Sequence, residues 1–302
     1  MRFAISIPQH VGDERFDPSA FRAYLRRAEQ LGFHSAWTQE GILGRASNLA
    51  PIETMTYAAA STNRLRLGCA VFVTPLHSPI HLAKSLSTLD QLSGGRLEVG
   101  VGTGGRGRMF SAFGVDDRIV GRFSEGLALM KACWTESRIT FQGRFWQLDG
   151  AAMEPKPLQK PHPPIWVGGN HPAALRRAVR VGAGFFGAGS TTTARFAEQV
   201  EVVREALRES RRDPDNFAIA KRVYIAVDDR PARAREEMEA ALRRHYGREG
   251  MAAVAVTGTP EQCVRGLREV SAAGAELIQL NPMFDDAQQM ERLAAEVIPA
   301  LA

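Results

Sequence analysis

Small and polar residues stand at the ends of several predicted strands, where parallel α/β proteins bind their ligands. The candidate positions are two single ionisable residues, one small apolar pair and three glycine-rich segments: His10, Glu40, Ala70-Val71, Gly102–Arg106 (with Thr103 and Arg106), Gly168-Gly169-Asn170 and Gly189-Ser190-Thr191. Glycine lets a ligand approach the backbone closely, so several such ends together favour a planar or phosphorylated ligand. Each glycine alone fits an ordinary tight turn equally well.

Two of these segments, Gly168-Gly169-Asn170 and Gly189-Ser190-Thr191, each lead into a predicted helix. We expect Asn170 to be the cap of the first helix and the second helix to start at Thr191. The first-turn amides of both helices would then face the carboxyl ends of the strands. Backbone amides at a helix start bind anions, so the pair predicts a phosphate site. An ordinary helix cap explains either segment alone, but their place on consecutive late strands favours the phosphate site.

Motifs for metal or nucleophilic catalysis are missing from the sequence. Its seven histidines form no HxH or HExxH pair, and its three cysteines form no CxxC pair. These spacings predict neither a metal site nor a disulfide framework. No GxSxG elbow or P-loop occurs. We therefore expect a cofactor to carry the chemistry.

Alternating strand and helix patterns predict the scaffold that positions these residues. The predicted strands are residues 3–7, 34–38, 65–73, 97–101, 164–169, 184–187, 218–227 and 277–280, each followed by a helix. Eight such units in about 300 residues predict an α/β fold, a (β/α)8 TIM barrel, forming a single domain over residues 1–302. Residues 135–164 break the alternation with a hairpin pattern and a proline-rich stretch. We interpret them as an insertion between units four and five that packs over one end of the barrel and shapes the substrate pocket.

The composition of the chain limits the classes of binding partner that we expect. The chain of 302 residues is 44% hydrophobic and has a net charge of +5. No apolar run is long enough to span a membrane and no signal peptide is recognisable, so we expect a cytoplasmic protein without membrane contact. Arginine pairs lie on predicted helices without interleaved aromatic residues, so nucleic acid is not an expected partner. The basic balance suits an acidic small molecule.

Several motifs together carry a family resemblance. They are RLRLGCAV (64–71), TPLHSP (74–79), LDQLSGGRLEVGVGTG (89–104), PPIWVGGN (163–170) and AGAELIQL (273–280). In this order they resemble the bacterial luciferase-like monooxygenase superfamily over essentially the whole chain. The pattern is most similar to the branch that uses the 5-deazaflavin coenzyme F420, which implies hydride transfer between the coenzyme and a small organic substrate. An FMN-dependent monooxygenase is the first alternative, and a barrel that binds flavin without turnover is the second.

The resemblance also implies roles for particular residues. The family has an acidic residue after the second strand, usually followed by histidine, and this chain has Glu40 followed by Gly41. A non-prolyl cis peptide, which lies behind the coenzyme ring in the family, falls at Ala70-Val71. Arg106 suits the acidic tail of the coenzyme, although a solvated loop explains it almost as well. Relatives are often dimers, which implies a homodimer.

Two histidines remain to be assigned. Because the family histidine is missing, His10 at the end of the first strand becomes the candidate acid, since imidazole titrates near neutral pH. A structural histidine that stacks on the coenzyme ring is the alternative for His10. We interpret His77 as a residue that packs its own loop.

Overall fold

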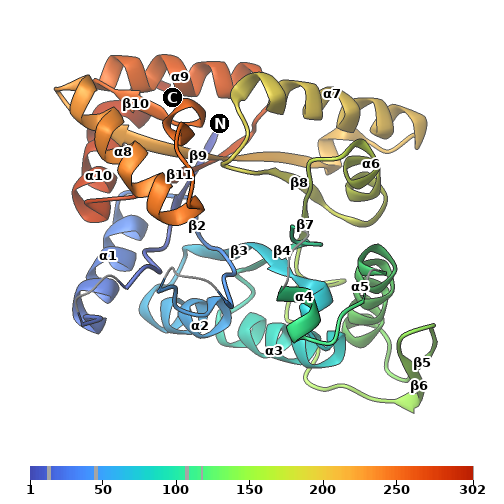
Figure 1. Ribbon diagram of the computed structural model, residues 1–302. Helices are drawn as coiled ribbons and strands as arrows, with labels where there is room; N and C mark the ends of the chain where they lie inside the picture. The colour runs from blue at the N-terminus through green and yellow to red at the C-terminus, as the bar shows by residue number, and fades with distance from the viewer. Residues whose placement is uncertain (12–14, 44–46, 106–108, 117, 302) are drawn as a thin grey trace.

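Eight parallel strands close into a barrel in the computed structural model of the chain (Figure 1), which describes residues 1–11, 15–43, 47–105, 109–116 and 118–301. In order around the barrel they are β1 (Arg2–Ser6), β2 (Ser35–Thr38), β3 (Arg66–Val73), β4 (Leu97–Gly102), β7 (Ile165–Gly168), β8 (Gly184–Gly187), β9 (Ala218–Val227) and β11 (Leu277–Asn281). The ring closes because β11 pairs with β1 and β8 pairs with β9. The predicted TIM barrel and its eight strands are confirmed.

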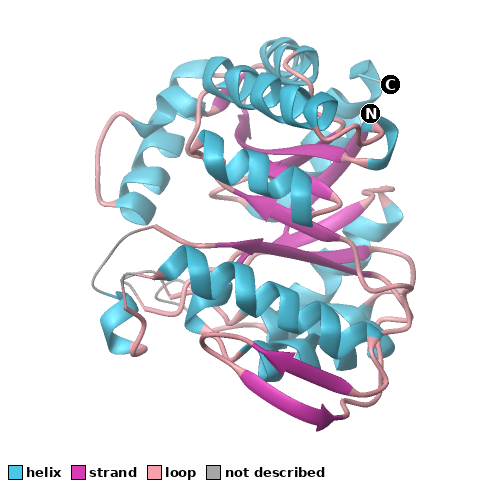
Figure 2. Ribbon diagram, turned by 90° about the vertical axis from the view of Figure 1, so that its right-hand side faces the viewer, coloured by secondary structure: helices cyan, strands magenta, loops and turns pink. Residues whose placement is uncertain are grey.

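Helices surround the strands (Figures 1 and 2). They are α1 (Pro18–Gln30), α2 (Pro51–Ser61), α3 (Pro79–Leu92), α4 (Met109–Ala112), α5 (Ile119–Thr135), α6 (Pro172–Val181), α7 (Thr193–Glu209), α8 (Pro231–Tyr246), α9 (Pro260–Ala272) and α10 (Asp286–Arg292). Many begin at proline, whose fixed φ and missing N–H suit the first helical position. None of the helices within the described ranges has the length and apolar character needed to cross a membrane.

The predicted insertion begins with a hairpin outside the barrel. Strands β5 (Ile139–Gln142) and β6 (Gln147–Ala151) form it, and Figure 2 shows it apart from the barrel strands. Glu125 of α5 fastens the turn, because its carboxylate accepts the backbone N–H groups of Phe145 and Trp146 at 2.8 and 2.9 Å. The hairpin is thus attached to the helix layer.

The proline-rich part of the insertion reaches the amino-terminal end of the barrel. The side chain of Gln159 donates to the Leu97 carbonyl at 2.8 Å and accepts from Arg66 at 3.0 Å, where β4 and β3 begin. The insertion therefore packs over one end of the barrel, as predicted. The hairpin turn lies elsewhere, because Phe145 packs against Arg118 and Arg122 at the start of α5, which follows the carboxyl end of β4. The expectation that the insertion shapes the substrate pocket stays a prediction.

Aromatic rings fill the barrel interior. Trp37, Trp166 and Phe186 are buried and contact one another, and the ring centroids of Trp37 and Phe186 lie 4.7 Å apart. Toward the strand starts, Glu98 accepts the Trp166 indole N–H at 2.6 Å and pairs with Arg66 at 2.5 Å. This plug closes the amino-terminal half. A ligand must therefore bind at the other end, where the strands finish, which we call the mouth.

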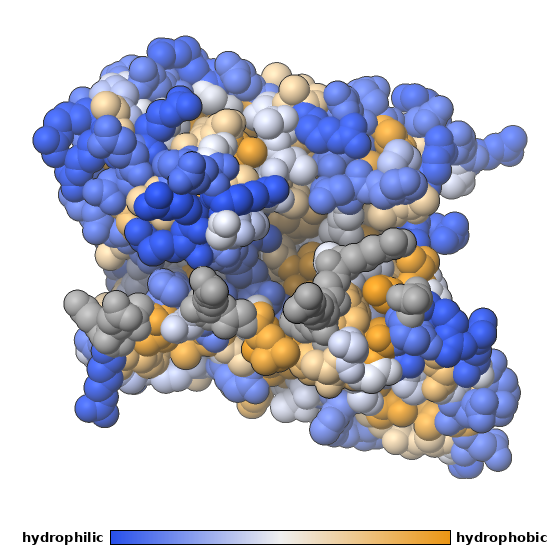
Figure 3. All heavy atoms as spheres, viewed as in Figure 1, coloured by the Kyte–Doolittle hydropathy of each residue, from blue (hydrophilic) through white to orange (hydrophobic). Residues whose placement is uncertain are grey.

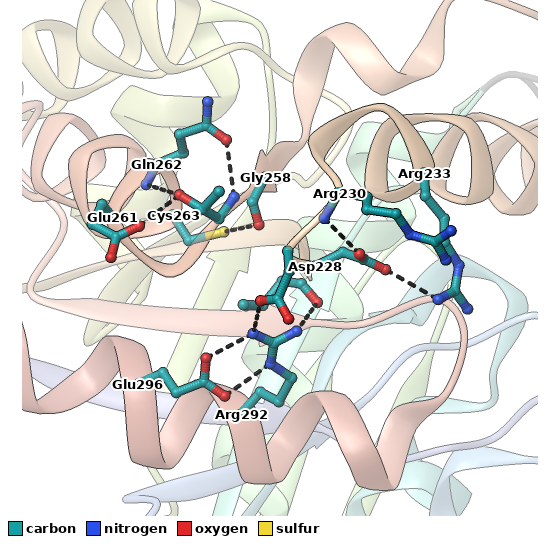
Figure 4. Close-up of polar contacts among 12 residues, drawn as sticks. Asp228, Arg230, Arg233, Gly258, Glu261, Gln262, Cys263, Arg292 and Glu296 are labelled. Atoms are coloured by element: carbon teal, nitrogen blue, oxygen red, sulfur yellow. Dashed lines mark hydrogen bonds and ion pairs between the residues drawn. The ribbon is translucent and has the colours of Figure 1, made fainter.

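A ninth strand, β10 (Val256–Gly258), was not predicted and pairs with β9 outside the ring. It leads into α9, whose first turn is closed by a capping box between Thr259 and Gln262. Figure 4 shows the polar contacts of this edge, including the ion pair between Arg292 and Glu296 at 2.7 Å and the Cys263 thiol directed at a backbone carbonyl. The Cys263 thiol also lies 3.5 Å from the Ala226 carbonyl, and Arg292 pairs with Asp229 at 2.7 Å, so α9 and α10 are held against the end of β9.

Candidate active site

Strand β3 ends at the mouth in an irregular segment. Its pairing with β4 changes register between Cys69 and Phe72, and the Ala70-Val71 peptide bond between them is cis. The cis peptide that the resemblance implies is therefore confirmed. Ala70 packs in one cluster with the buried aromatic residues Trp37, Trp166 and Phe186, whereas Val71 is only partly buried. We call Ala70 and Val71 the β3 bulge.

Glycines on the neighbouring strands make room for this bulge. A Cβ at Gly100 would overlap the Cys69 carbonyl oxygen. A Cβ at Gly102 would lie 2.7 Å from the Val71 side chain, and one at Gly168 would lie 3.0 Å from it. The sequence interpretation has these glycines expose backbone to a ligand, but the structure fills the space beside them with protein. Their small size sets where Val71 lies at the mouth.

Glu40, just after β2, contacts both the end of β3 and a histidine. Its Oε2 accepts the Val73 N–H at 2.7 Å, and its Oε1 lies 2.8 Å from Nε2 of His77. The Glu40 side chain is 3% exposed and the His77 side chain 23%. His77 therefore does more than pack its own loop. A buried carboxylate paired with an imidazole can hold and transfer a proton, although Gly41 stands where the family has histidine.

Arg222 of β9 crosses the mouth to the β3 bulge. Its Nη2 donates to the Ala70 carbonyl at 2.7 Å, and its Nη1 donates to Oε1 of Gln39. Gln9 fixes Gln39 in turn, because Oε1 of Gln9 accepts the Gln39 backbone N–H at 2.6 Å. The Nε of Arg222 is buried and has no partner among the described residues. Sequence reasoning missed Arg222, since its contact with Ala70 spans 152 positions.

A cavity of about 500 Å³ opens on the other side of the mouth. Its described lining comes from the ends of β1, β2 and β11, from the segment around Asn48 and from α8. Figure 3 shows this face of the molecule hollowed near its centre. His10 lines the cavity, is exposed, and forms a backbone bridge with Asn48. The two candidate catalytic residues are thus on different sides, with His10 at the cavity and Glu40 at the bulge.

The segment Gly168-Gly169-Asn170 precedes α6, but Asn170 is not its cap. His171 is the cap, and its Nδ1 accepts the Ala173 N–H at 3.2 Å. The predicted cap is wrong by one residue because a residue before proline favours extended backbone, which is the geometry of a cap. The amide oxygen of Asn170 instead accepts from Gln199 at 3.1 Å.

The segment Gly189-Ser190-Thr191 is held by a buried lysine. Helix α7 begins two residues later than predicted and is capped by Thr192. Lys221 on β9 donates to the Ala188 carbonyl at 2.5 Å and to the carbonyl and hydroxyl of Thr191 at 3.0 and 3.1 Å. Burial, together with the charge of Arg222, lowers the pKa of Lys221 to about 7. An anion bound at this loop would favour the charged form of Lys221.

The loop after β4 supplies the remaining candidates. Thr103 is partly buried, and its hydroxyl donates to the Gly104 carbonyl at 3.3 Å. Gly104 has a φ of +69° and lies against Val73. Arg106 lies outside the described residues. No cluster of metal-binding side chains occurs in the part of the chain that the structure describes.

Comparison with known proteins identifies the family. The profile described as luciferase-like monooxygenase matches residues 1–252. The chain belongs to the luciferase-like monooxygenase family. The crystal structure of the monooxygenase RslO1 from Streptomyces bottropensis is similar over 100% of both chains, with a TM-score of 0.85 and 26% identity.

Relatives in this family are named for two different coenzymes. The F420-dependent glucose-6-phosphate dehydrogenase of Intrasporangium calvum is 27% identical over 325 residues, covering 95% of this chain and 96% of that protein. The FMNH(2)-dependent dimethylsulfone monooxygenase of Pseudomonas putida is 34% identical over 190 residues, covering 61% of this chain and 52% of that protein. The chain spans about half the length of several curated relatives that it matches.

Proposed function

We propose that this chain is an oxidoreductase that transfers a hydride between the deazaflavin coenzyme F420 and a small organic substrate. The observation that carries the proposal is the contact between the end of β3 and the Glu40–His77 pair, made through the Val73 N–H at 2.7 Å. Hydride transfer to or from carbon needs a surface that supports the coenzyme ring and a nearby group that handles the accompanying proton. The bulge and the pair would supply these two functions side by side.

The residues at the mouth fit such a group. Bound deazaflavin would supply the hydride chemistry at its ring. Val71 would support the ring, and the Glu40–His77 pair would take up or give the proton. The Nε of Arg222 and the hydroxyl of Thr74 are buried without partners among the described residues, so polar groups here are free to bind a ligand.

The two loops after β7 and β8 would hold the coenzyme phosphate. Gly168-Gly169-Asn170 precedes the amino end of α6, and Gly189-Ser190-Thr191 precedes that of α7, where backbone amides attract anions. Lys221 beneath the second loop would add positive charge once an anion binds. Thr103 and Arg106, which lies outside the described residues, would flank the tail. His10 would be an alternative acid on the cavity side.

The extent of the similarity supports the deazaflavin over FMN. The match to the F420-dependent relative spans almost all of both chains, whereas the match to the FMNH(2)-dependent relative spans 52% of that protein. The net charge of +5 also suits an acidic coenzyme tail. An FMN-dependent monooxygenase is the second candidate, favoured by the full-length similarity to the monooxygenase RslO1.

A titration of the full chain with F420, and separately with FMN and reduced FMN, tests the coenzyme. Trp37 and Trp166 lie beneath the mouth, so intrinsic fluorescence should report binding. We expect micromolar or tighter binding of F420 and at least about tenfold weaker binding of both forms of FMN. The reverse order would favour the monooxygenase. Absence of binding by all three would overturn the proposed site.

We further propose that residues 1–302 form one domain and that the chain acts as a homodimer, as the family resemblance implies. Light scattering after gel filtration should give twice the monomer mass of 33.1 kDa. A monomer mass would contradict the dimer.

A further inference from the structure

The cavity at the mouth is lined by different elements from those that surround the β3 bulge. Its described lining belongs to β1, β2, β11, α8, the start of α10 and the segments that follow these strands, and includes no residue of β3, β4 or β7. At about 500 Å³ it has the size of a small-molecule site. Its lining contains basic side chains and hydrogen-bond acceptors that have no role in the proposed coenzyme site.

Basic side chains reach this cavity without acidic partners. Arg244 and His245 line it from the last turn of α8, and His10 lines it from the end of β1. Burial lowers the pKa of His245, and the charges of Arg222 and His10 lower it further. Arg244 forms no ion pair with any described residue. Favourable placement at a helix carboxyl end explains basic residues in this turn, but not their convergence with His10 on one cavity. This arrangement of basic side chains favours the binding of an anion in the cavity.

The part of the lining formed by β11 and the residues that follow it presents hydrogen-bond acceptors without donors. The amide NH2 of Asn281 must face the Pro282 carbonyl, which can only accept, at 2.8 Å, so its Oδ1 is left without a donor among the described residues. The Nε2 of Gln279 donates to Ser6 at 3.0 Å, and its Oε1 is likewise left without a donor in the described part of the chain. Asp286 also lines the cavity and has no ion-pair partner within the described ranges. Buried acceptors without donors are unfavourable, so this part of the lining favours a ligand that donates.

The spacing of these acceptors indicates what kind of donor they suit. Gln279 and Asn281 are two residues apart on β11, so their side chains lie about 6.6 Å apart along one face. Two hydrogen bonds of about 2.9 Å from one ammonium would span less than that distance. Hydroxyl groups distributed along a carbon chain can meet both acceptors and Asp286.

We propose that this cavity binds a hydroxylated organic anion as the substrate, with its anionic group at Arg244 and His245 and its hydroxyl groups at Asp286, Asn281 and Gln279. The inference deepens the proposed function and rests on it, because it assigns the cavity as the substrate side of the same mouth. His10 and Trp37 also line the cavity and would contact such a ligand.

Calorimetric titration of the full chain without coenzyme tests this assignment. Three probes separate the contributions: sorbitol 6-phosphate, sorbitol alone and inorganic phosphate alone. We expect sorbitol 6-phosphate to bind at least about tenfold more tightly than either part, because charge-assisted and neutral hydrogen bonds are then made together. Equal affinity for phosphate and sorbitol 6-phosphate would overturn the hydroxyl assignment. Absence of binding by all three would overturn the site.

Variants of one helix turn provide the matched control. Arg244→Gln should weaken sorbitol 6-phosphate binding by about tenfold and leave sorbitol binding unchanged. Arg243→Gln should change neither, since Arg243 is directed at Glu249, 3.7 Å away. Equal effects of the two substitutions would contradict a specific role for Arg244. Both arginines are exposed, so both variants should fold.

Asp286→Asn tests the hydroxyl-binding part of the lining. It should weaken sorbitol 6-phosphate binding by about fivefold and leave phosphate binding unchanged, because only hydroxyl contacts are lost. Unchanged affinity for sorbitol 6-phosphate would overturn the role of Asp286. These titrations contain no coenzyme, so they can succeed or fail independently of the F420 titration.

Discussion

The two sides of the mouth differ in which of their polar groups lack partners. On the bulge side, Glu40 accepts from Val73 and pairs with His77, and Arg222 donates to the Ala70 carbonyl. The unpaired groups on this side are the Nε of Arg222 and the hydroxyl of Thr74, which can both donate and have no partner among the described residues. On the cavity side, the acceptors of Gln279 and Asn281 have no donor among the described residues.

This difference indicates two kinds of site on one scaffold. Groups that already have protein partners hold a fixed surface, which suits a coenzyme that binds in the same way in every turnover. Groups without partners gain most from a ligand. The unpaired donors of the bulge side suit acceptors of the coenzyme, and the unpaired acceptors of the cavity side select among substrates, because the wrong ligand leaves them unpaired. Three substitutions and one binding measurement test this distinction.

The largest effect is expected where protein fills the space beside a glycine. In Gly100→Val the new Cβ would overlap the Cys69 carbonyl, and a backbone atom cannot easily move away. We expect a loss of at least about 3 kcal/mol in the free energy of unfolding, measured by urea denaturation. Gly105→Val is the control, because a Cβ there meets nothing within 4 Å. Similar losses in both variants would show that the bulge does not depend on Gly100.

A smaller effect is expected from Glu40→Ala. The substitution leaves the Val73 N–H and His77 without their partner, which should lower the free energy of unfolding by about 1 to 3 kcal/mol without unfolding the barrel. The affinity for F420 should fall by about tenfold, measured by fluorescence titration. Glu53→Ala, at an exposed position of α2, is the control. Unchanged affinity would remove Glu40 from the coenzyme site.

The smallest expected effect is the pH dependence of the free energy of unfolding that arises from Asp286 on the cavity side. Burial raises the pKa of Asp286 to about 6 from 3.8, so the folded protein keeps a proton that the unfolded chain has released between these values. The free energy of unfolding should therefore fall by on the order of 2 kcal/mol as the pH rises from about 4 to about 6. Asp286→Asn should remove this contribution. Identical pH profiles of wild type and variant, measured by denaturation, would contradict it.

Much of the fold could be predicted because it depends on local signals. Short apolar runs, helix-starting prolines and the cap at Thr259 identify the eight units and their order. The strand β10 was missed because three residues, Val256–Gly258, are too few to show a pattern. The cap of α6 was misplaced by one residue because Asn170 and His171 are both suited to that position.

The site was harder to predict because its contacts cross the barrel. Glu40 and His77 are 37 positions apart, and Arg222 and Ala70 are 152 apart. Such pairs depend on how strands from different units come together when the barrel closes. The resemblance located the cis peptide, but not the reason for Gly100 and Gly102, which make room for the bulge.

The central claim is that the bulge side holds the coenzyme and the cavity side holds the substrate at the same time. The most direct test is the calorimetric affinity for sorbitol 6-phosphate of the chain saturated with F420, compared with the coenzyme-free chain. We predict that the two dissociation constants agree within about threefold or that the saturated chain binds more tightly. Loss of sorbitol 6-phosphate binding on saturation with F420 would show that the two ligands compete for one site, and would contradict the account.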